Sequence, residues 1–283
     1  MKKLALLSCL YFLGFNVFAQ FGNFKKKDDL EKFKDTKLIV VLFPDSAYTF
    51  SIAAAIERYW TFTGFEFAED TSMYRYKKGD YAFMYFSKSK GSKNKAKLAS
   101  CVEDFNGLVI TKKYSRRVVP DNLLAYAYCS NRIDTGDWEG EMTRAVQLLN
   151  NYFNYAVQAK SNGDINPTRM MNNYPSDKSM LLDKKLLIEN GQLDLKGSKL
   201  DAMTLFDGDA EEVDIDDIYK AIKWQDNTLL YYYYSKDEKY CNKLVISAAN
   251  SELMYFDSTS PDKCKCNAKD LKALKDIKTR VNK

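Results

Sequence analysis

The fold is decided by a short aromatic stretch, Asp80-Tyr81-Ala82-Phe83-Met84-Tyr85-Phe86-Ser87-Lys88, which returns later as Asp226-Asn227-Thr228-Leu229-Leu230-Tyr231-Tyr232-Tyr233-Tyr234-Ser235-Lys236. Each version follows an Asp, continues as an apolar or aromatic run and closes with Ser-Lys. An uninterrupted run of this kind is typical of a strand that is buried on both faces. The pair therefore predicts the inner strands of two related α/β units.

Other apolar runs surround these two strands in a similar order. Lys37–Phe43 in the first half corresponds to Lys185–Glu189 in the second, and Phe65–Ala68 corresponds to Met203–Phe206. A succession of strand, helix and strand favours a right-handed parallel crossover. We predict an α/β fold of two similar, three-layer-like units with mixed, mainly parallel sheets, produced by an internal duplication.

Shifts in composition divide the chain into four parts. We expect a signal peptide at residues 1–19, a polar leader at 20–36, a first α/β unit at 37–165 that ends in a long helix, and a second α/β unit at 166–283 with a C-terminal hairpin and helix. The boundary between the units falls in the Asn/Gly/Pro-rich segment 160–175, because these residues favour turns.

Local patterns place further helices and strands. The strongest helix follows Asp134, because apolar residues from Met142 to Val157 recur at helical intervals. Ser46 or Asp45 caps an earlier helix, and Asn267 caps the closing one. Further strands are predicted at residues 107–112, 123–129, 241–247 and 253–257, the last two as a hairpin.

The N-terminus has the pattern of a secretory signal peptide. Met1-Lys2-Lys3 is a charged start, Leu4–Val17 is largely apolar, and Val17-Phe18-Ala19 fits a cleavage site before Gln20. The alternative is a lipoprotein, suggested by Leu6-Leu7-Ser8-Cys9. We expect an exported protein that is periplasmic, outer-membrane-associated or secreted, with no integral membrane span after cleavage.

Composition excludes several classes of chemistry. The chain contains no His, which removes Ser-His-Asp and Cys-His catalysis as well as His-based zinc sites. The formal net charge is +5, and the charges are mixed along the sequence. Nucleic-acid binding needs a concentrated basic face, so we expect no nucleic-acid partner.

Five cysteines follow the predicted cleavage site, and export favours disulfides. We predict one bond between Cys101 and Cys129, and another between Cys241 and either Cys264 or Cys266. The alternative is a set of ordinary half-buried thiols. Cys-x-Cys without a second pair does not supply four tetrahedral ligands, so we expect no zinc site here.

Other candidate sites have simpler structural explanations. The acidic segment Asp207–Asp217 lacks the EF-hand arrangement, and a solvated loop leading into a helix explains it. The lysine-rich stretch Ser87–Lys97 is interpreted as a loop, and Trp60–Phe65 as a core plug rather than a ligand groove. No phosphate loop or nucleophile elbow is present. We therefore predict no catalytic residue, cofactor or metal ligand.

Two segments resemble a family of exported proteins of the Bacteroidota that has no assigned activity. They are Arg58-Tyr59-Trp60-Thr61-Phe62-Thr63, which runs into Phe65-Glu66-Phe67, and the hairpin residues 243–249 with 253–256. The resemblance implies an envelope location and an α/β architecture. It implies no catalytic residue.

These observations favour a non-enzymatic interaction or binding module of the cell envelope, with a protein partner there. The main alternative is a carboxylate-dependent hydrolase that acts on an envelope or extracellular polymer. A third is a thiol–disulfide protein that uses Cys264 and Cys266. Any site is expected near Ser87-Lys88, near Ser235-Lys236 or in the groove between the two units.

Overall fold

A computed structural model describes residues 27–44, 46–76, 79–90, 104–115, 122–129, 137–162, 174, 183–196, 200–236 and 241–281. These residues form helices and two mixed five-stranded sheets, which is the predicted α/β class. The predicted signal peptide, the alternative lipoprotein motif and most of the predicted boundary segment lie outside the described residues.

The first sheet has the strand order β2-β1-β3-β4-β5. β1 pairs in parallel with β2 and β3, whereas β4 pairs antiparallel with β3 and β5. The strands are β1 Lys37–Leu42, β2 Phe65–Glu69, β3 Tyr81–Lys90, β4 Asp104–Thr111 and β5 Leu123–Tyr128.

The second sheet repeats this arrangement, with the order β8-β6-β9-β10-β11 when read from β8. β6 pairs in parallel with β8 and β9, whereas β10 pairs antiparallel with β9 and β11. The strands are β6 Lys185–Glu189, β8 Ala210–Val213, β9 Leu229–Lys236, β10 Cys241–Ser247 and β11 Leu253–Thr259. A small parallel pair joins β7 Leu193–Asp194 to β12 Cys266–Asn267.

The two units share strand order and direction. The starts of β1 and β6, at residues 37 and 185, are 148 positions apart, and so are those of β3 and β9, at 81 and 229. β2 and β8 start 145 positions apart, at residues 65 and 210. The two predicted similar units are therefore present. Parallel pairs do not predominate, because each sheet has two parallel and two antiparallel pairings.

The predicted counterpart of β2 was wrong. Met203–Phe206 lies in the helix α6 Ala202–Phe206, whose start is capped because the Asp201 side chain accepts from the backbone N–H of Thr204. The true counterpart is β8, in a segment that was predicted to be an acidic loop. β8 is an edge strand, and its acids Glu211 and Glu212 are exposed. Charged edge strands of this kind resist pairing with another chain.

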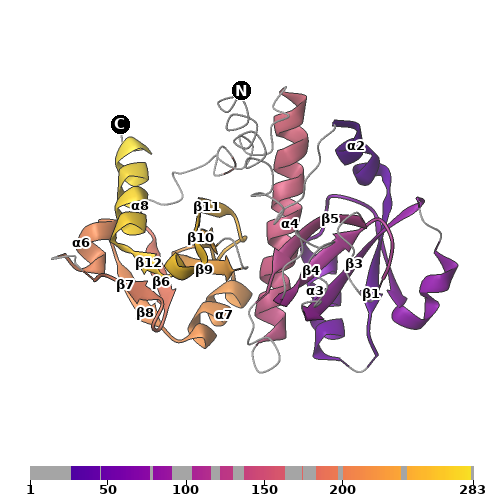
Figure 1. Cartoon of the computed structure of the whole chain (residues 1–283), viewed down its shortest axis with the longest axis horizontal. Coiled ribbons are helices and arrows are strands. Elements are labelled where there is room, and N and C mark those ends of the chain that lie inside the picture. Colours follow the sequence, from indigo (N-terminus) through magenta and orange to yellow (C-terminus); the bar gives the residue numbers. More distant parts are fainter. Residues whose placement is uncertain are drawn as a thin grey trace, which may run out of the picture.

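Most of the remaining helices lie between the two sheets, and Figure 1 shows α4 standing upright in this position. One continuous core includes residues of both sheets and of α2, α3, α4 and α7. A second core lies on the far face of the second sheet, under α6 and α8. The helices are α2 Lys27–Asp35, α3 Ala47–Tyr59, α4 Trp138–Ser161, α7 Ile215–Trp224, α8 Ala268–Val281 and the 3-10 turns η1 Asp70–Arg75 and η4 Pro261–Lys263.

The helix α4 brings the two units together. Its N-cap Asp137 accepts from the backbone N–H of Gly140 and forms an ion pair with Lys223 of α7. A Cβ at Gly140 would lie 2.8 Å from the Tyr219 ring of α7. Because real Cβ contacts are longer than this, α4 approaches α7 so closely only with glycine at this position.

Part of the predicted polar leader belongs to the fold. Leu30 and Phe33 of α2 are buried in the shared core, and the Phe33 ring centre is 5.1 Å from that of Phe153 on α4. The predicted caps of two other helices are present, since Ser46 accepts from Thr49 N–H and Asn267 accepts from Lys269 N–H. None of the described helices is both long enough and apolar enough to cross a membrane.

Candidate functional site

A cavity of about 200 Å³ lies between the two units. Its walls come from the N-terminal part of α4, from α7, from β9 and from the ends of β4, β5 and β6. This is the groove between the units and the end of β9, two of the three places where the sequence predicts a site. At the third, Ser87 is buried, and the Lys88 side chain lies outside the described residues.

The aromatic strand β9 forms one wall of this cavity. Its side chains alternate, with Tyr231 in the shared core and Tyr232 in the core beneath α8. Tyr233 and Tyr234 pack against the same two cores in turn. The strand is therefore buried on both faces, as its sequence predicts. The strand is a structural element, and it also contributes to the cavity at the end that leads to Ser235.

A buried ion pair underlies the cavity. Arg144 Nη2 lies 2.6 Å from Glu141 Oε2, and the side chains are only 1% and 0% exposed. The same nitrogen donates to the backbone carbonyl of Tyr128 on β5 and, at 3.2 Å, to the Tyr233 hydroxyl on β9. Arg144 of α4 thus contacts β5 of the first unit and β9 of the second.

Both oxygens of the Glu141 carboxylate accept a hydrogen bond. Its Oε1 accepts from the Tyr219 hydroxyl of α7 at 2.8 Å, while its Oε2 accepts from Arg144. Burial lowers the pKa of Arg144, but the summed interactions with its neighbours, of which Glu141 is the largest, raise this pKa well above its ordinary value. Arg144 therefore stays charged, and the Glu141 carboxylate beside it balances this charge.

The guanidinium of Arg144 is not fully paired. Nε and Nη1 are buried, and neither has a hydrogen-bond partner among the described residues. The Arg144 Cζ atom lies 3.9 Å from the centre of the Tyr233 ring, a cation–π contact that recovers part of the lost solvation. A buried N–H without an acceptor costs about 1–3 kcal/mol, so the cation–π contact offsets only part of the cost of burying this group.

Three other titratable side chains of the cavity have raised pKa values. Burial raises the pKa of the Tyr231 and Tyr233 phenols, and it raises that of the Cys129 thiol to about 12. Proton transfer near neutral pH requires a group with a pKa close to that range. These three side chains are therefore suited to packing and hydrogen bonding.

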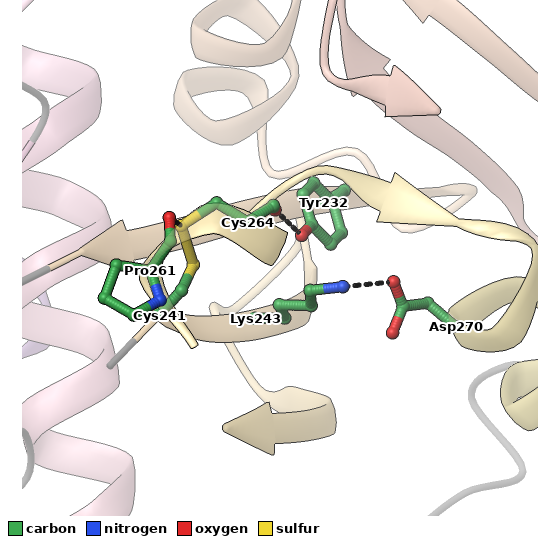
Figure 2. The surroundings of a disulfide bond; sticks show 6 residues. All are labelled: Tyr232, Cys241, Lys243, Pro261, Cys264 and Asp270. Carbon is green, nitrogen blue, oxygen red and sulfur yellow. Dashed lines mark hydrogen bonds and ion pairs between the residues drawn. A yellow bond between two sulfur atoms is a disulfide. The ribbon is translucent and has the colours of Figure 1, made fainter. Parts of the chain in front are cut away.

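One predicted disulfide is present. Cys241 is bonded to Cys264, with a Cα–Cα distance of 5.5 Å (Figure 2). Cys266 is a free buried thiol, and burial raises its pKa. Cys101 lies outside the described residues, so the pairing of Cys101 with Cys129 stays a prediction. Cys129 is buried and forms no disulfide with any described residue.

A second buried ion pair lies close to the disulfide. Lys243 Nζ of β10 is 2.6 Å from Asp270 Oδ2, and both side chains are 2% exposed (Figure 2). Asp270 also accepts from the backbone N–H of Asn267 and from the Tyr255 hydroxyl. The neighbour of Lys243, Leu244, belongs to the shared core, so Lys243 points to the opposite face of the sheet, away from the cavity.

The weaker candidates have structural roles. In the acidic segment Asp207–Asp217, Asp207 ends α6, Asp209 precedes β8, and the other acids lie on β8 or at the start of α7. The described residues contain no group of three or more Cys, Asp or Glu side chains arranged to hold a metal ion. Trp60 is a core residue, since its ring is buried and its Nε1 donates to the Thr63 hydroxyl.

Sequence reasoning missed Glu141 and Arg144. They are three residues apart on α4, and both border the apolar positions that predict this helix. The sequence does offer one signal for these residues: two charged side chains lie beside the apolar stripe of the helix. The buried face of a helix is wider than its apolar positions alone, so such residues can be buried. The partners on β5, α7 and β9 are distant in sequence, so the pattern alone does not reveal the network.

Scans against protein-family models, curated proteins and solved structures yield no match to this chain.

Proposed function

We propose that this chain is an exported, non-enzymatic binding module of the cell envelope, and that its ligand binds in the cavity between the units. The observation that carries the proposal is the combination of this cavity with the buried and incompletely paired Arg144. Native proteins pair nearly all buried polar groups, so each exception needs an explanation, and a role in binding is one of them. Ligand sites are commonly concave, partly apolar and located between structural units.

The alternative, a carboxylate-dependent hydrolase, has weaker support. Glu141 and Glu189 both line the cavity, so two carboxylates do occur in one concave site. A glycosidase requires one carboxyl group to donate a proton and the other to act as base or nucleophile. Glu141 already accepts from Arg144 and Tyr219 with its two oxygens. A group held in this way is suited to structure and charge balance, which favours binding over hydrolysis.

Export is supported by the N-terminal pattern and by the disulfide. Disulfides form and persist in oxidising compartments, which include the periplasm and the cell exterior. Fractionation of cells that express the full chain tests this part. We expect the protein outside the cytoplasm, shortened at its N-terminus, whereas a full-length cytoplasmic protein contradicts export.

The binding site is tested by filling the cavity. Ile218 of α7 lines it, and Ile218→Trp adds bulk there. The matched control is Lys220→Trp, which places the same ring on an exposed position of the same helix. Four single-ring probes (toluene, benzamide, benzoate and benzylamine) are titrated into each protein and followed by ¹H–¹⁵N NMR.

We expect at least one probe to shift resonances of cavity residues in the wild type and in Lys220→Trp, and Ile218→Trp to abolish these shifts. Failure of all four probes to bind contradicts the proposal. So does binding that Ile218→Trp leaves unchanged.

A further inference from the structure

We propose that the outer side of the helices α6 and α8 attaches this protein to the surface of an anionic lipid bilayer. Figure 1 shows these two helices at the end of the molecule away from the first unit. The surface concerned, the α8 face, consists of the exposed residues Leu200, Met203, Lys263, Lys265, Lys269 and Lys272. None of them lines the cavity, and the proposal does not depend on the ligand of the cavity.

The helix α8 separates apolar from basic side chains. Leu271, Leu274 and Ile277 are buried in the core beneath it. The structure describes every residue from 261 to 280, and in this range five cations but only two acids are exposed. The cations are Lys263, Lys265, Lys269, Lys272 and Arg280, and the acids are Asp262 and Asp276. The outer side of α8 therefore carries an excess of positive charge.

The other charged side chains of the two helices do not cancel this excess. Asp270 is buried and forms its ion pair with Lys243 at 2.6 Å. Lys275 Nζ lies 3.8 Å from Asp207 Oδ1 at the end of α6, so these two charges balance each other. Asp201 caps the start of α6 and is an exposed acid there, on the shorter of the two helices. The positive charge is concentrated along α8.

The lysines of the α8 face are attached to a fixed stretch of backbone. Cys264 is bonded to Cys241 of β10, and Asp270 is paired with Lys243 of the same strand. Lys265 and Lys269 lie between these two connections. Because the backbone is already ordered, binding through these lysines loses less conformational entropy than binding through a flexible tail.

The charge of the α8 face disfavours another protein unit of the same kind as its partner. By its place after the fifth strand of its unit, α8 corresponds to α4, which the second unit covers. Every residue of α4 from Gly140 to Asn150 is buried, whereas α8 exposes lysines along its outer side. A second copy of the chain is also disfavoured, because its formal net charge is +5. The complementary partner is an anionic surface.

Exposed apolar side chains beside the lysines favour a bilayer over a soluble polyanion. Met203 of α6 is 51% exposed, and Leu200 is 48% exposed. The helices α6 and α8 are neighbours, since Lys278 Nζ donates to the backbone carbonyl of Asp207. A bilayer offers anionic headgroups to the lysines and the start of the acyl chains to Met203 and Leu200. A soluble polyanion leaves these two apolar side chains in water.

Vesicle co-sedimentation tests the proposal. The protein is purified in the form that the expressing cells accumulate, and it is mixed with vesicles of phosphatidylcholine alone or with about one third phosphatidylglycerol. We expect the anionic vesicles to bind at least about tenfold more tightly than the neutral ones. High salt should remove this difference, because it screens exposed charges.

A charge reversal on α8 identifies the surface. Lys269→Glu combined with Lys272→Glu should weaken binding to anionic vesicles by more than about tenfold. The matched control is Lys32→Glu combined with Lys34→Glu, which changes the net charge equally at exposed positions of α2 in the first unit. The control should weaken binding by less than about threefold. All forms have the same N-terminus, so any contribution from that segment cancels.

Met203→Ser separates a bilayer from a soluble polyanion. It should weaken binding to anionic vesicles about threefold, because less apolar surface is buried, and it should not change binding to polyglutamate. The proposal is overturned by equal binding to the two kinds of vesicle, by equal losses in the two double variants or by vesicle binding that Met203→Ser leaves unchanged. Vesicle binding and probe binding in the cavity are separate measurements, so either proposal can fail without the other.

Discussion

The molecule contains two buried ion pairs that have the same geometry and different roles. Arg144–Glu141 and Lys243–Asp270 each have a separation of 2.6 Å, and all four side chains are at most 2% exposed. Asp270 accepts from the backbone N–H of Asn267, the cap residue of α8. Figure 2 shows the Lys243–Asp270 pair near the Cys241–Cys264 bond. Arg144 instead adjoins a cavity and retains unpaired donors.

The difference shows how a structural ion pair is distinguished from one at a site. The exposed fractions and the N–O distances do not distinguish the two pairs, because these values are nearly equal. The environment does: Lys243–Asp270 lies in the core under α8 and stabilises a helix start, whereas Arg144–Glu141 joins the two units beside the cavity. Removal of each cation should therefore have different consequences for stability and for binding.

The largest effect is expected from Lys243→Met. It leaves the Asp270 carboxylate buried without its cation, which costs about 3–5 kcal/mol in the free energy of unfolding. Urea unfolding measures this loss. The control is Lys220→Met, which breaks an exposed pair with Asp217 and should cost less than about 1 kcal/mol. Equal losses in the two variants would contradict the structural role of Lys243.

The second effect concerns the disulfide beside Lys243. Cys264→Ser opens a loop that spans 23 positions, which lowers the free energy of unfolding by about 3 kcal/mol. Cys241→Ser should give the same loss, and the double variant should add nothing. Benzamide binding, corrected for stability, should be unchanged in all three. A change in binding would show that the two regions are not independent.

A smaller loss of about 2 kcal/mol is expected from Arg144→Met. The substitution leaves Glu141 without its cation, but it also removes the unpaired N–H groups, and the Tyr219 hydroxyl still donates to the carboxylate. The same urea unfolding measures the difference from Lys243→Met. A loss for Arg144→Met that equals or exceeds that for Lys243→Met would contradict the partial pairing of Arg144.

The smallest effect is expected from Tyr219→Phe, which removes the hydrogen bond to Glu141 Oε1 without changing the ring that packs on Gly140. We expect a loss of about 1 kcal/mol in the free energy of unfolding. The control is Tyr74→Phe at an exposed position, which should change stability by less than about 0.5 kcal/mol. No measurable difference between the two variants would show that Tyr219 does not support the pair.

Much of the fold follows from local patterns in the sequence. The strands β1, β3 and β9 are continuous apolar runs, and the hairpin of β10 and β11 has a short polar loop. The error at residues 203–213 came from composition. Four of the residues in α6 are apolar or small, whereas the strand β8 carries two adjacent acids. An edge position permits those acids, and edge positions are set by tertiary pairing.

The site was only partly predictable. The sequence predicts a site at the end of β9 and in the groove between the units, because binding sites often lie where structural units meet. Arg144, Glu141 and Tyr219 were not predicted, because their importance depends on the close approach of α4 and α7 at Gly140. That approach joins residues 78 positions apart, from Glu141 to Tyr219.

The most direct test of the account is an NMR measurement on both cations during a benzamide titration. The Nε–H signal of Arg144, identified by its loss in Arg144→Met, and the Nζ signal of Lys243 are followed together. If benzamide binds in the cavity beside Arg144, the Arg144 signal shifts during the titration and the Lys243 signal stays in place. Binding of benzamide with no change at Arg144, or with an equal change at Lys243, would contradict it.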